Sequence, residues 1–468
     1  MVHQYKNNGY NIVLDANSGS VHVVDDVAYD IIALYEDHTP QEITAAILEK
    51  YADQPDVTET EIQETLRDIE QLKKDGRLFS EDTYENLAWD FKNRSTVIKA
   101  LCLHIAHDCN LACKYCFAGK GEYCGDKALM SFEVGKQALD FLIANSGTRH
   151  NLEVDFFGGE PLMNFDVVKQ LVAYAREQEK IHNKNFRFTL TTNGVLLTDE
   201  VMEFANKEMY NVVLSLDGRK ETNDRLRVTR NGKGSYDMIV PRFQKMAELR
   251  HQEGYYVRGT YTHYNTDFAK DILHIADLGF KQLAMEPVVA DPKEDYALKE
   301  EDLPVLLEQY DILAQEMLRR SRKGNGFTFF HYMIDLAGGP CIYKRISGCG
   351  VGTEYMAVTP WGDLYPCHQF VGNEKFKLGD VFHGIQNTEL RDEFKLCNVY
   401  ARKECHDCFA KMFCSGGCTA NAYHATGSLT GTYQLGCDLH RKRIECAIML
   451  KVAEAMDQES KKNEEHPL

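Results

Sequence analysis

The sequence predicts an α/β protein whose centre is a parallel sheet, open or curled into a barrel. Three observations predict this class. From about residue 98 to 310, apolar strand-like runs alternate with amphipathic helical stretches, the order of right-handed β–α–β units. Residues 1 to about 85 hold a smaller set of strand and helix patterns. Ten of the 15 cysteines lie between Cys341 and Cys446, and none precedes Cys102.

Composition narrows the class of protein. The chain has 468 residues, of which 44% are hydrophobic and 26% charged, as in ordinary globular proteins. The formal net charge of −18 argues against nucleic acid or an anionic membrane as a partner. The start shows no signal peptide, and no apolar run reaches the length of a membrane span. We therefore expect a cytoplasmic protein whose cysteines bind metal or clusters rather than form disulfides.

The N-terminal unit, residues 1–85, is predicted from local signals. "NGYNIVLD" and "VHVVDD" indicate two strands joined by the turn "ANSGS". Three helices follow; Thr39 is the expected N-cap of the second, with Pro40 in its first turn, and the third ends near Gly76. The pattern is typical of a winged-helix module, and a small structural cap is the alternative. Residues 86–97 are predicted to be a linker.

The central region, residues 98–310, contains six predicted strands. They are 98–106, 151–159, 186–194, 210–218, 255–265 and 280–289. Glycine and polar residues follow the strands, where parallel sheets place their sites. A bridging helix is expected within 311–340, a cysteine-rich region over 341–450, and a disordered tail over 451–468.

Three cysteines, Cys109, Cys113 and Cys116, come directly after the first central strand. Three thiolates on a tight loop can hold three irons of a [4Fe–4S] cluster and leave the fourth iron open. Two alternatives stay open: a zinc site completed by His104 or His107, and plain buried cysteines.

The spacing CxxxCxxC, with "GGEP" (158–161), "TTNG" (191–194) and "SLDG" (215–218), resembles the radical SAM enzymes. The resemblance implies a partial (β/α)6 barrel. It also implies a cluster whose open iron chelates S-adenosylmethionine (SAM), which is cleaved to a 5′-deoxyadenosyl radical. The implied SAM contacts are Phe117 at the adenine, Gly158, Gly159 and Glu160 at the amino group, Asn193 and Ser215 at the ribose, and Arg227 at the carboxylate. For Arg227 a solvated surface charge is the alternative, and Arg225, Arg230 and Arg258 compete for the role.

The C-terminal cysteines resemble the SPASM extension of radical SAM peptide maturases, because "GDLYPC" (362–367) precedes CxxCxxxxxCxxxC and a final cysteine. A zinc ribbon is the alternative. The resemblance implies two auxiliary [4Fe–4S] clusters, and thus three in all. The outer one would use Cys405, Cys408, Cys414 and Cys437. The inner one would use Cys349, Cys367 and Cys418, with Cys341 as fourth ligand; without Cys341, an iron is open to a substrate thiolate. Cys102, Cys124, Cys397 and Cys446 fit no pattern, and we expect them to be buried.

Over nearly its full length the chain resembles the maturases of six-cysteine (SCIFF) peptides, and residues 1–85 resemble a PqqD-like peptide-recognition element. The resemblance implies a cysteine-rich precursor peptide whose leader adds as a strand to the N-terminal sheet. It also implies a thioether from a peptide cysteine to an acceptor carbon, typically of threonine, a reductant such as flavodoxin or ferredoxin, and an anaerobic host. Formylglycine-type oxidation, epimerisation, carbon–carbon crosslinking and a non-catalytic electron-transfer or peptide-binding protein are the alternatives. No catalytic acid or base is assigned; His368 and Asp438 are candidates, and a supporting role beside the ligands is favoured for both.

Overall fold

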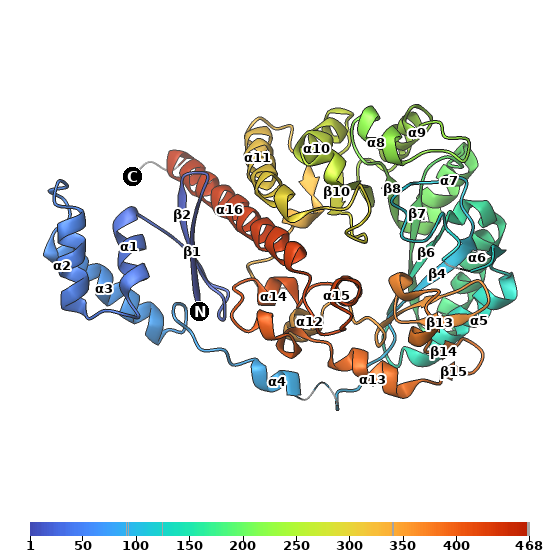
Figure 1. Cartoon of the computed structure of the whole chain (residues 1–468), viewed down its shortest axis with the longest axis horizontal. Helices are drawn as coiled ribbons and strands as arrows, with labels where there is room; N and C mark the ends of the chain where they lie inside the picture. Colours follow the sequence, from blue (N-terminus) through green and yellow to red (C-terminus); the bar gives the residue numbers. More distant parts are fainter. Residues whose placement is uncertain (90, 92, 124, 339–340, 466–468) are drawn as a thin grey trace.

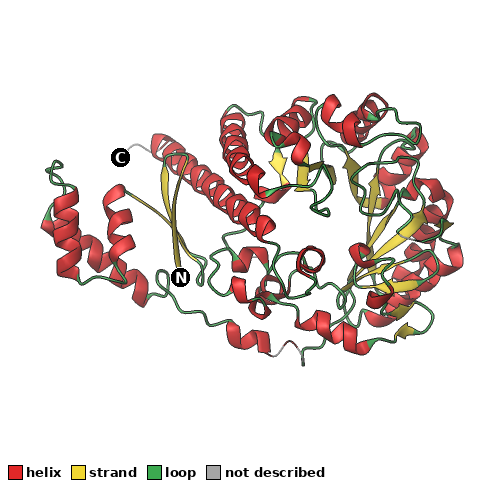
Figure 2. Ribbon diagram, viewed as in Figure 1, coloured by secondary structure: helices red, strands yellow, loops and turns green. Residues whose placement is uncertain are grey.

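The computed structural model describes residues 1–89, 91, 93–123, 125–338 and 341–465. The N-terminal unit lies at one end of the molecule and the central sheet at the other (Figure 1). The long C-terminal helix α16 (Gln434–Glu465) and a set of short helices lie between them (Figure 2).

The N-terminal unit has three antiparallel strands in the order β1-β2-β3 and three helices. Its elements are β1 (Val2–Asn7), β2 (Tyr10–Asp15), β3 (Val21–Val24), α1 (Asp26–Leu34), α2 (Pro40–Lys50) and α3 (Glu59–Lys74). Thr39 caps α2 and exchanges hydrogen bonds with Glu42, as its sequence predicts. Strand β1 is additional to the two predicted strands.

Strand β1 contacts α16 directly. The Tyr5 hydroxyl donates to the Glu445 carbonyl at 3.0 Å, and the Asn7 amide donates to Asp311 at 2.9 Å. The His3 ring stacks on Phe409 with 3.5 Å between ring centroids. The N-terminal unit is therefore bound to the cysteine-rich region and to the helix that leaves it.

All six predicted central strands form, and they are parallel. They are β4 (Ala100–His107), β6 (Asn151–Gly158), β7 (Asn185–Thr192), β8 (Met209–Ser215), β9 (Tyr255–Tyr261) and β10 (Gln282–Pro287). The helices are α5 (Phe132–Asn145), α6 (Phe165–His182), α7 (Asp199–Glu208), α8 (Lys220–Leu226), α9 (Tyr236–Leu249), α10 (Phe268–Asp277) and α11 (Leu303–Arg322).

The two faces of this sheet differ. Paired residues of neighbouring parallel strands share a face, and side chains alternate along each strand. One face carries Asp155, Ser215, Arg258 and Glu286 in linked register; we call it the inner face. The other face packs on the helices, as where Tyr261 stacks on Phe268 of α10. A polar inner face suits a binding site rather than a closed core.

The C-terminal region extends the same sheet, so that it has 12 strands within the described residues. Strand β12 (Tyr355–Val358) pairs in parallel with β4, and β13 (Asp363–Tyr365), β14 (Gly379–Asp380) and β15 (Gly384–Ile385) follow antiparallel. The short strands β5 (Ala128–Leu129) and β11 (Thr328–Phe329) pair with β4 and β10. The remaining α-helices are α4 (Glu85–Trp89), α12 (Ile342–Ser347), α13 (Thr388–Leu396), α14 (Lys411–Cys414) and α15 (Thr419–Thr426).

Two predictions at the chain's C-terminal side need correction. The bridging helix starts at Leu303, before the expected 311, and is followed by β11 rather than by more helix. The prediction of a disordered tail is wrong for residues 451–465, which continue α16. This part of α16 stays ordered because it lies beside α11, where Arg322 pairs with Asp457 at 2.8 Å. Residues 466–468 lie outside the described residues.

Candidate functional site

The three-cysteine loop leaves the carboxyl end of β4 and is held there by the two glycines of "GGEP". The Gly159 amide donates to the Ala106 carbonyl at 2.8 Å. A Cβ on Gly158, whose φ is +116°, would lie 2.4 Å from the Ala106 oxygen, and one on Gly159 would lie 2.1 Å from the Asp108 oxygen. Glycine is needed here because the chain itself, at the start of the loop, approaches so closely.

Glu160 is fully buried and connects this turn to the next strand. Its carboxylate accepts hydrogen bonds from the Leu162 amide at 3.1 Å, the Thr192 hydroxyl at 2.8 Å and the Asn193 amide at 2.8 Å. Burial raises the pKa of Glu160 to about 7, although these donors oppose the shift. The side chain thus positions the "TTNG" turn.

The thiols of the loop are buried beside one another. Cys109 Sγ faces the Leu111 amide at 3.4 Å and the Asn193 side-chain amide at 3.5 Å. Burial raises the pKa of Cys109 to about 12, and Glu160, Cys113 and Cys116 add to the shift. Burial also raises the pKa of Cys113, against the charge of Arg227. These thiols therefore become good ligands only when a metal displaces their protons.

Arg227 is 8% exposed, which excludes a solvated surface charge. Its Nη1 donates to the Tyr115 hydroxyl at 2.8 Å, and that hydroxyl donates to Asp217 at 2.6 Å. Its buried Nε has no hydrogen-bond partner among the described residues. One guanidinium N–H beside the cysteine loop is thus left for another acceptor.

The competing arginines have other partners. Arg225 lies over the Tyr264 ring at 3.5 Å, and Arg230 pairs with Asp108. Arg258 lies on the inner face beside Ser215, its partner in register. Ser215 itself is half-buried at the end of β8.

Phe117 is 50% exposed and faces the C-terminal region. Its ring lies 5.5 Å from that of His368 and 5.9 Å from that of Tyr123. His368, which follows Cys367, also contacts Phe157 of β6 at 5.2 Å. Burial and Arg258 lower the pKa of His368 to about 4. The two cysteine regions therefore meet across one set of rings.

His104 and His107 hydrogen-bond to each other at 3.0 Å, and both rings contact Tyr123. Burial lowers the pKa of both imidazoles. Within the part of the chain that the structure describes, no three histidine, cysteine, aspartate or glutamate side chains lie close enough to share one metal ion.

The C-terminal thiols form two groups. The first group is Cys405, Cys408, Cys414 and Cys437. Burial raises the pKa of Cys405 to about 11, and Cys408 and Cys437 add to the shift; burial raises the pKa of Cys414 to about 12, and the other three add to it. Cys349, Cys367 and Cys418 form the second group; burial raises the pKa of Cys349 and Cys367, and Cys418 adds to both.

Cys341 is exposed, as Cys349 and Cys418 are, and it directly precedes α12. Of the four unassigned cysteines, Cys102, Cys397 and Cys446 are buried as predicted, and Cys124 lies outside the described residues. Asp438, in the first turns of α16, pairs with Arg441.

Sequence reasoning missed Tyr115, Asp217 and Asp155. Burial raises the pKa of Asp155, on the inner face of β6, to about 7, and Glu153 adds to the shift. The segment "EVDFF" alternates charged and apolar residues, which places Glu153 and Asp155 on one face of the strand and could have indicated Asp155.

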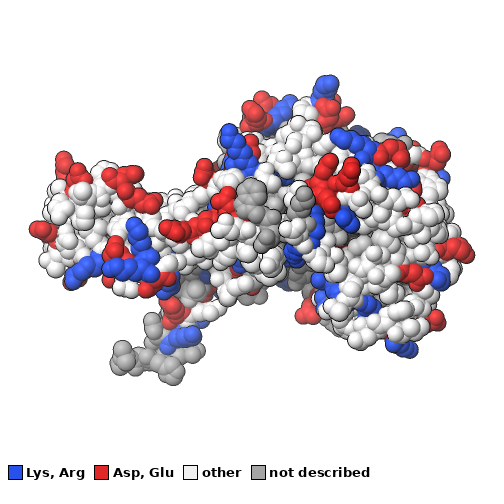
Figure 3. Space-filling model, turned by 90° about the horizontal axis from the view of Figure 1, so that it is seen from below, with Lys and Arg blue, Asp and Glu red and all other residues white. Residues whose placement is uncertain are grey.

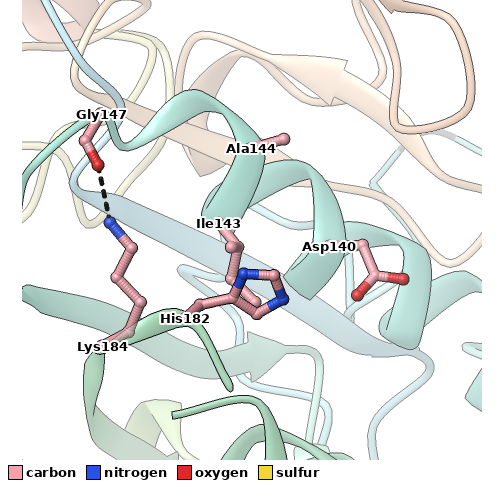
Figure 4. Close-up of a pocket in the computed structure, with 6 residues that line it drawn as sticks. All are labelled: Asp140, Ile143, Ala144, Gly147, His182 and Lys184. Carbon is pink, nitrogen blue, oxygen red and sulfur yellow. Dashed lines mark hydrogen bonds between the residues drawn. The ribbon is translucent and has the colours of Figure 1, made fainter. Parts of the chain in front are cut away.

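Other surface features lie away from this site. A depression of about 490 Å³ lies between α5 and α6, near the amino ends of the strands, and Lys184 there donates to the Gly147 carbonyl at 2.7 Å (Figure 4). Acidic and basic side chains are interspersed on the face shown in Figure 3. No described helix is both long enough and apolar enough to span a membrane.

Comparison with protein families gives two matches. The model of the radical SAM superfamily matches residues 103–279, which contain the cysteine loop and the strands around it. The central barrel is a radical SAM domain. The model of coenzyme PQQ synthesis protein D (PqqD) matches residues 11–73, so the N-terminal unit is a PqqD-like domain. The predicted radical SAM and PqqD-like domains and the mixed α/β fold with a parallel sheet are confirmed.

Relatives and solved structures agree with this radical SAM fold. A cysteine-type anaerobic sulfatase-maturating enzyme of Clostridium novyi is 25% identical over 67% of this chain and 86% of its own. A structure of native anSMEcpe with bound AdoMet has a TM-score of 0.61 at 20% identity, covering 76% of this chain and 99% of that one. Streptococcus suis SuiB bound to precursor peptide SuiA has a TM-score of 0.52 at 17% identity, covering 92% and 97%.

A radical SAM domain implies SAM and a [4Fe–4S] cluster as cofactors. The residues present fit both. Three thiols converge from one loop, and a buried guanidinium with an unpartnered N–H lies beside them. Any cluster beyond this first one would be held by the C-terminal thiols.

Proposed function

We propose that this radical SAM enzyme is a peptide maturase that joins a cysteine sulfur of a cysteine-rich precursor peptide to a carbon of an acceptor residue, typically threonine. One observation carries the proposal. The ring of Phe117, directly after the cysteine loop, lies 5.5 Å from that of His368, directly after Cys367. His368 also contacts Phe157, which shares the inner face with Asp155. A peptide on that face would reach both.

In this proposal Cys109, Cys113 and Cys116 hold the first cluster, which with SAM supplies the 5′-deoxyadenosyl radical. The backbone of Gly158–Glu160, with Asn193, Ser215 and Phe117, lines the SAM site. Arg227 offers its free N–H to the SAM carboxylate, and Tyr115 holds the guanidinium in place. Burial of these groups strengthens each contact.

The C-terminal thiols hold two auxiliary clusters in this proposal. Cys405, Cys408, Cys414 and Cys437 hold the outer one, and Cys349, Cys367 and Cys418 the inner one. The members of each group shift one another's pKa, which supports one shared site for each group. Exposed Cys341 is the fourth ligand of the inner cluster or leaves an iron open to the substrate thiolate.

The PqqD-like domain binds the leader of the precursor in this proposal. Its sheet has β3 as the edge strand away from β1, and β1 is already in contact with α16. A leader strand would therefore add at β3, where backbone groups are unpaired. A reductant such as flavodoxin or ferredoxin supplies the electrons.

The test is mass spectrometry of a neighbouring cysteine-rich precursor incubated with reconstituted, reduced enzyme and SAM under anaerobic conditions. Forming the carbon–sulfur bond removes one hydrogen from sulfur and one from carbon, so the peptide loses the mass of two hydrogens. One cysteine should also resist alkylation. Deoxyadenosine formation with an unchanged peptide would contradict the thioether reaction while keeping the radical SAM activity.

A second candidate is oxidation of a peptide cysteine to formylglycine, favoured by the similarity to the Clostridium novyi enzyme. The same measurement separates the two reactions. Formylglycine formation removes the sulfur atom, whereas a thioether keeps it and blocks alkylation.

A further inference from the structure

A cluster of charged and imidazole side chains lies where α16 meets the carboxyl end of β10. It consists of Glu286 on β10, Arg258 on β9, His331 after β11, and His440 and Arg443 on α16. Figure 1 shows α16 crossing toward β10 from the N-terminal unit. None of these residues has a part in the proposed SAM or cluster binding.

The contacts inside the cluster leave donors unused. His331 Nε2 is 3.3 Å from Glu286, and Arg443 Nη1 is 3.7 Å from the other Glu286 oxygen; both exceed a good hydrogen bond. Only Arg443 Nη2 has a close partner, His440 Nδ1 at 2.8 Å. Among the described residues, Arg443 Nε and Nη1 and His331 Nε2 are buried with no hydrogen-bond partner.

Leaving buried donors without acceptors costs free energy, because they have given up their hydrogen bonds to water. The side chain of His331 is 8% exposed and that of Arg443 11%. Glu286 keeps 35% exposure, so the cluster opens on one side. That side is the inner face, because Glu286 shares its face with Arg258, which is exposed.

The net charge of the cluster favours an anion with a single negative charge. Burial lowers the pKa of His331 to about 4 and of His440 to about 3, so both are neutral near pH 7. Burial would raise the pKa of Glu286, but His331, Arg443, Arg258 and His440 outweigh it and lower the pKa, so the carboxylate is ionised. Two arginines and one carboxylate leave a single positive charge, which matches one carboxylate better than a phosphate dianion.

The position points to the peptide as the source of that anion. Arg258 pairs in register with Ser215 at the end of β8, and Arg443 lies six residues after Cys437 on α16. A group bound here would lie on the inner face between the radical SAM site and the C-terminal thiols. If the proposed function holds, the modified part of the peptide occupies that space.

We propose that Arg443, with Arg258 and His331, forms a subsite that binds a carboxylate of the peptide substrate. The carboxylate is either an aspartate or glutamate side chain or the C-terminus of the peptide. Glu286 positions both arginines without neutralising them. The subsite would set which residue of the peptide faces SAM.

The test uses the holoenzyme and three forms of the precursor: native, C-terminally amidated, and with each acidic residue changed in turn to its amide. Calorimetry gives the Kd of each form, and turnover gives KM and kcat. The leader is the same in all forms, so its contribution cancels in their ratios. One neutralised form should bind wild-type enzyme about tenfold to a hundredfold more weakly. If the weakened form is the amidated one, the bound carboxylate is the C-terminus of the peptide; otherwise it is the acidic side chain that was changed.

The enzyme arm uses Arg443→Met, Arg443→Lys as charge rescue, and Arg322→Met as a matched control on the outside of α11. Arg443→Met should raise the Kd for the native peptide by the same factor and leave the Kd for the neutralised form unchanged. Arg443→Lys should recover part of the loss, and Arg322→Met should change nothing. Equal binding of all peptide forms by wild-type enzyme overturns the subsite, even if Arg443→Met does not fold.

Peptide-free deoxyadenosine formation separates this proposal from the proposed function. If wild-type enzyme forms deoxyadenosine and modifies the native peptide, yet no neutralised form differs, only the subsite fails. If wild-type enzyme forms deoxyadenosine but modifies no form, the maturase function fails first.

Discussion

The two cysteine regions of this protein are built in opposite ways. Cys109, Cys113 and Cys116 lie within eight residues on one loop, held by strand ends and glycine contacts. The C-terminal thiols span 341–437 and come together only when short helices, β13 and the start of α16 pack. The first region depends on local contacts, and the second depends on the packing of the whole C-terminal half.

The largest effect is expected from removing one ligand of the three-cysteine loop. Cys113→Ala should reduce deoxyadenosine formation by at least about a thousandfold, because the cluster that cleaves SAM loses a ligand, with a loss of about four irons per chain. Deoxyadenosine assays and iron analysis measure it. Cys397→Ala, at another buried cysteine, is the control and should keep both its iron and its deoxyadenosine formation. An equal loss in this control would contradict the role of Cys113 as a cluster ligand.

The next change breaks the dispersed region. Cys414→Ala should also remove about four irons but leave peptide-free deoxyadenosine formation within about threefold of wild type. Peptide modification should stop. Loss of deoxyadenosine formation in this variant would show that the two regions do not act separately.

A smaller effect is expected on SAM binding. Arg227→Met should raise the Kd for SAM about tenfold to a hundredfold, because a charged hydrogen bond to the carboxylate is lost. Equilibrium binding of SAM to the holoenzyme measures it. Arg225→Met, which removes only the stacking on Tyr264, should leave the Kd unchanged.

The last prediction concerns stability rather than activity, at Asp155 on the face that joins the two regions. Because burial raises its folded-state pKa to about 7, its contribution to stability is present below the unfolded pKa and is lost as pH rises to about 7. As the pH rises from about 4 to about 8, the unfolding free energy of wild type should therefore fall by about 2–4 kcal/mol relative to that of Asp155→Asn. Denaturant titrations at both pH values measure the change; Asp166→Asn, on the exposed side of α6, should show no such difference.

Much of the barrel could be predicted from local patterns. Alternating apolar strands and amphipathic helices appear in the sequence as they do in the fold, and so do the capping signals at Thr39. The tail was predicted wrongly because charge composition says nothing about a neighbour such as α11. The strands β12–β15 were missed because two to four residues carry no reliable periodicity.

By itself the sequence determined the three-cysteine loop, the glycine turn beside it and the order of the parallel strands, since each depends on neighbours along the chain. Only the tertiary structure decided that Arg227 is buried against Tyr115 and that Arg443 meets Glu286 on the inner face. Those relations join residues up to 157 positions apart. Packing of α16 against the barrel, rather than any local pattern, brings such groups together and sets their charge states.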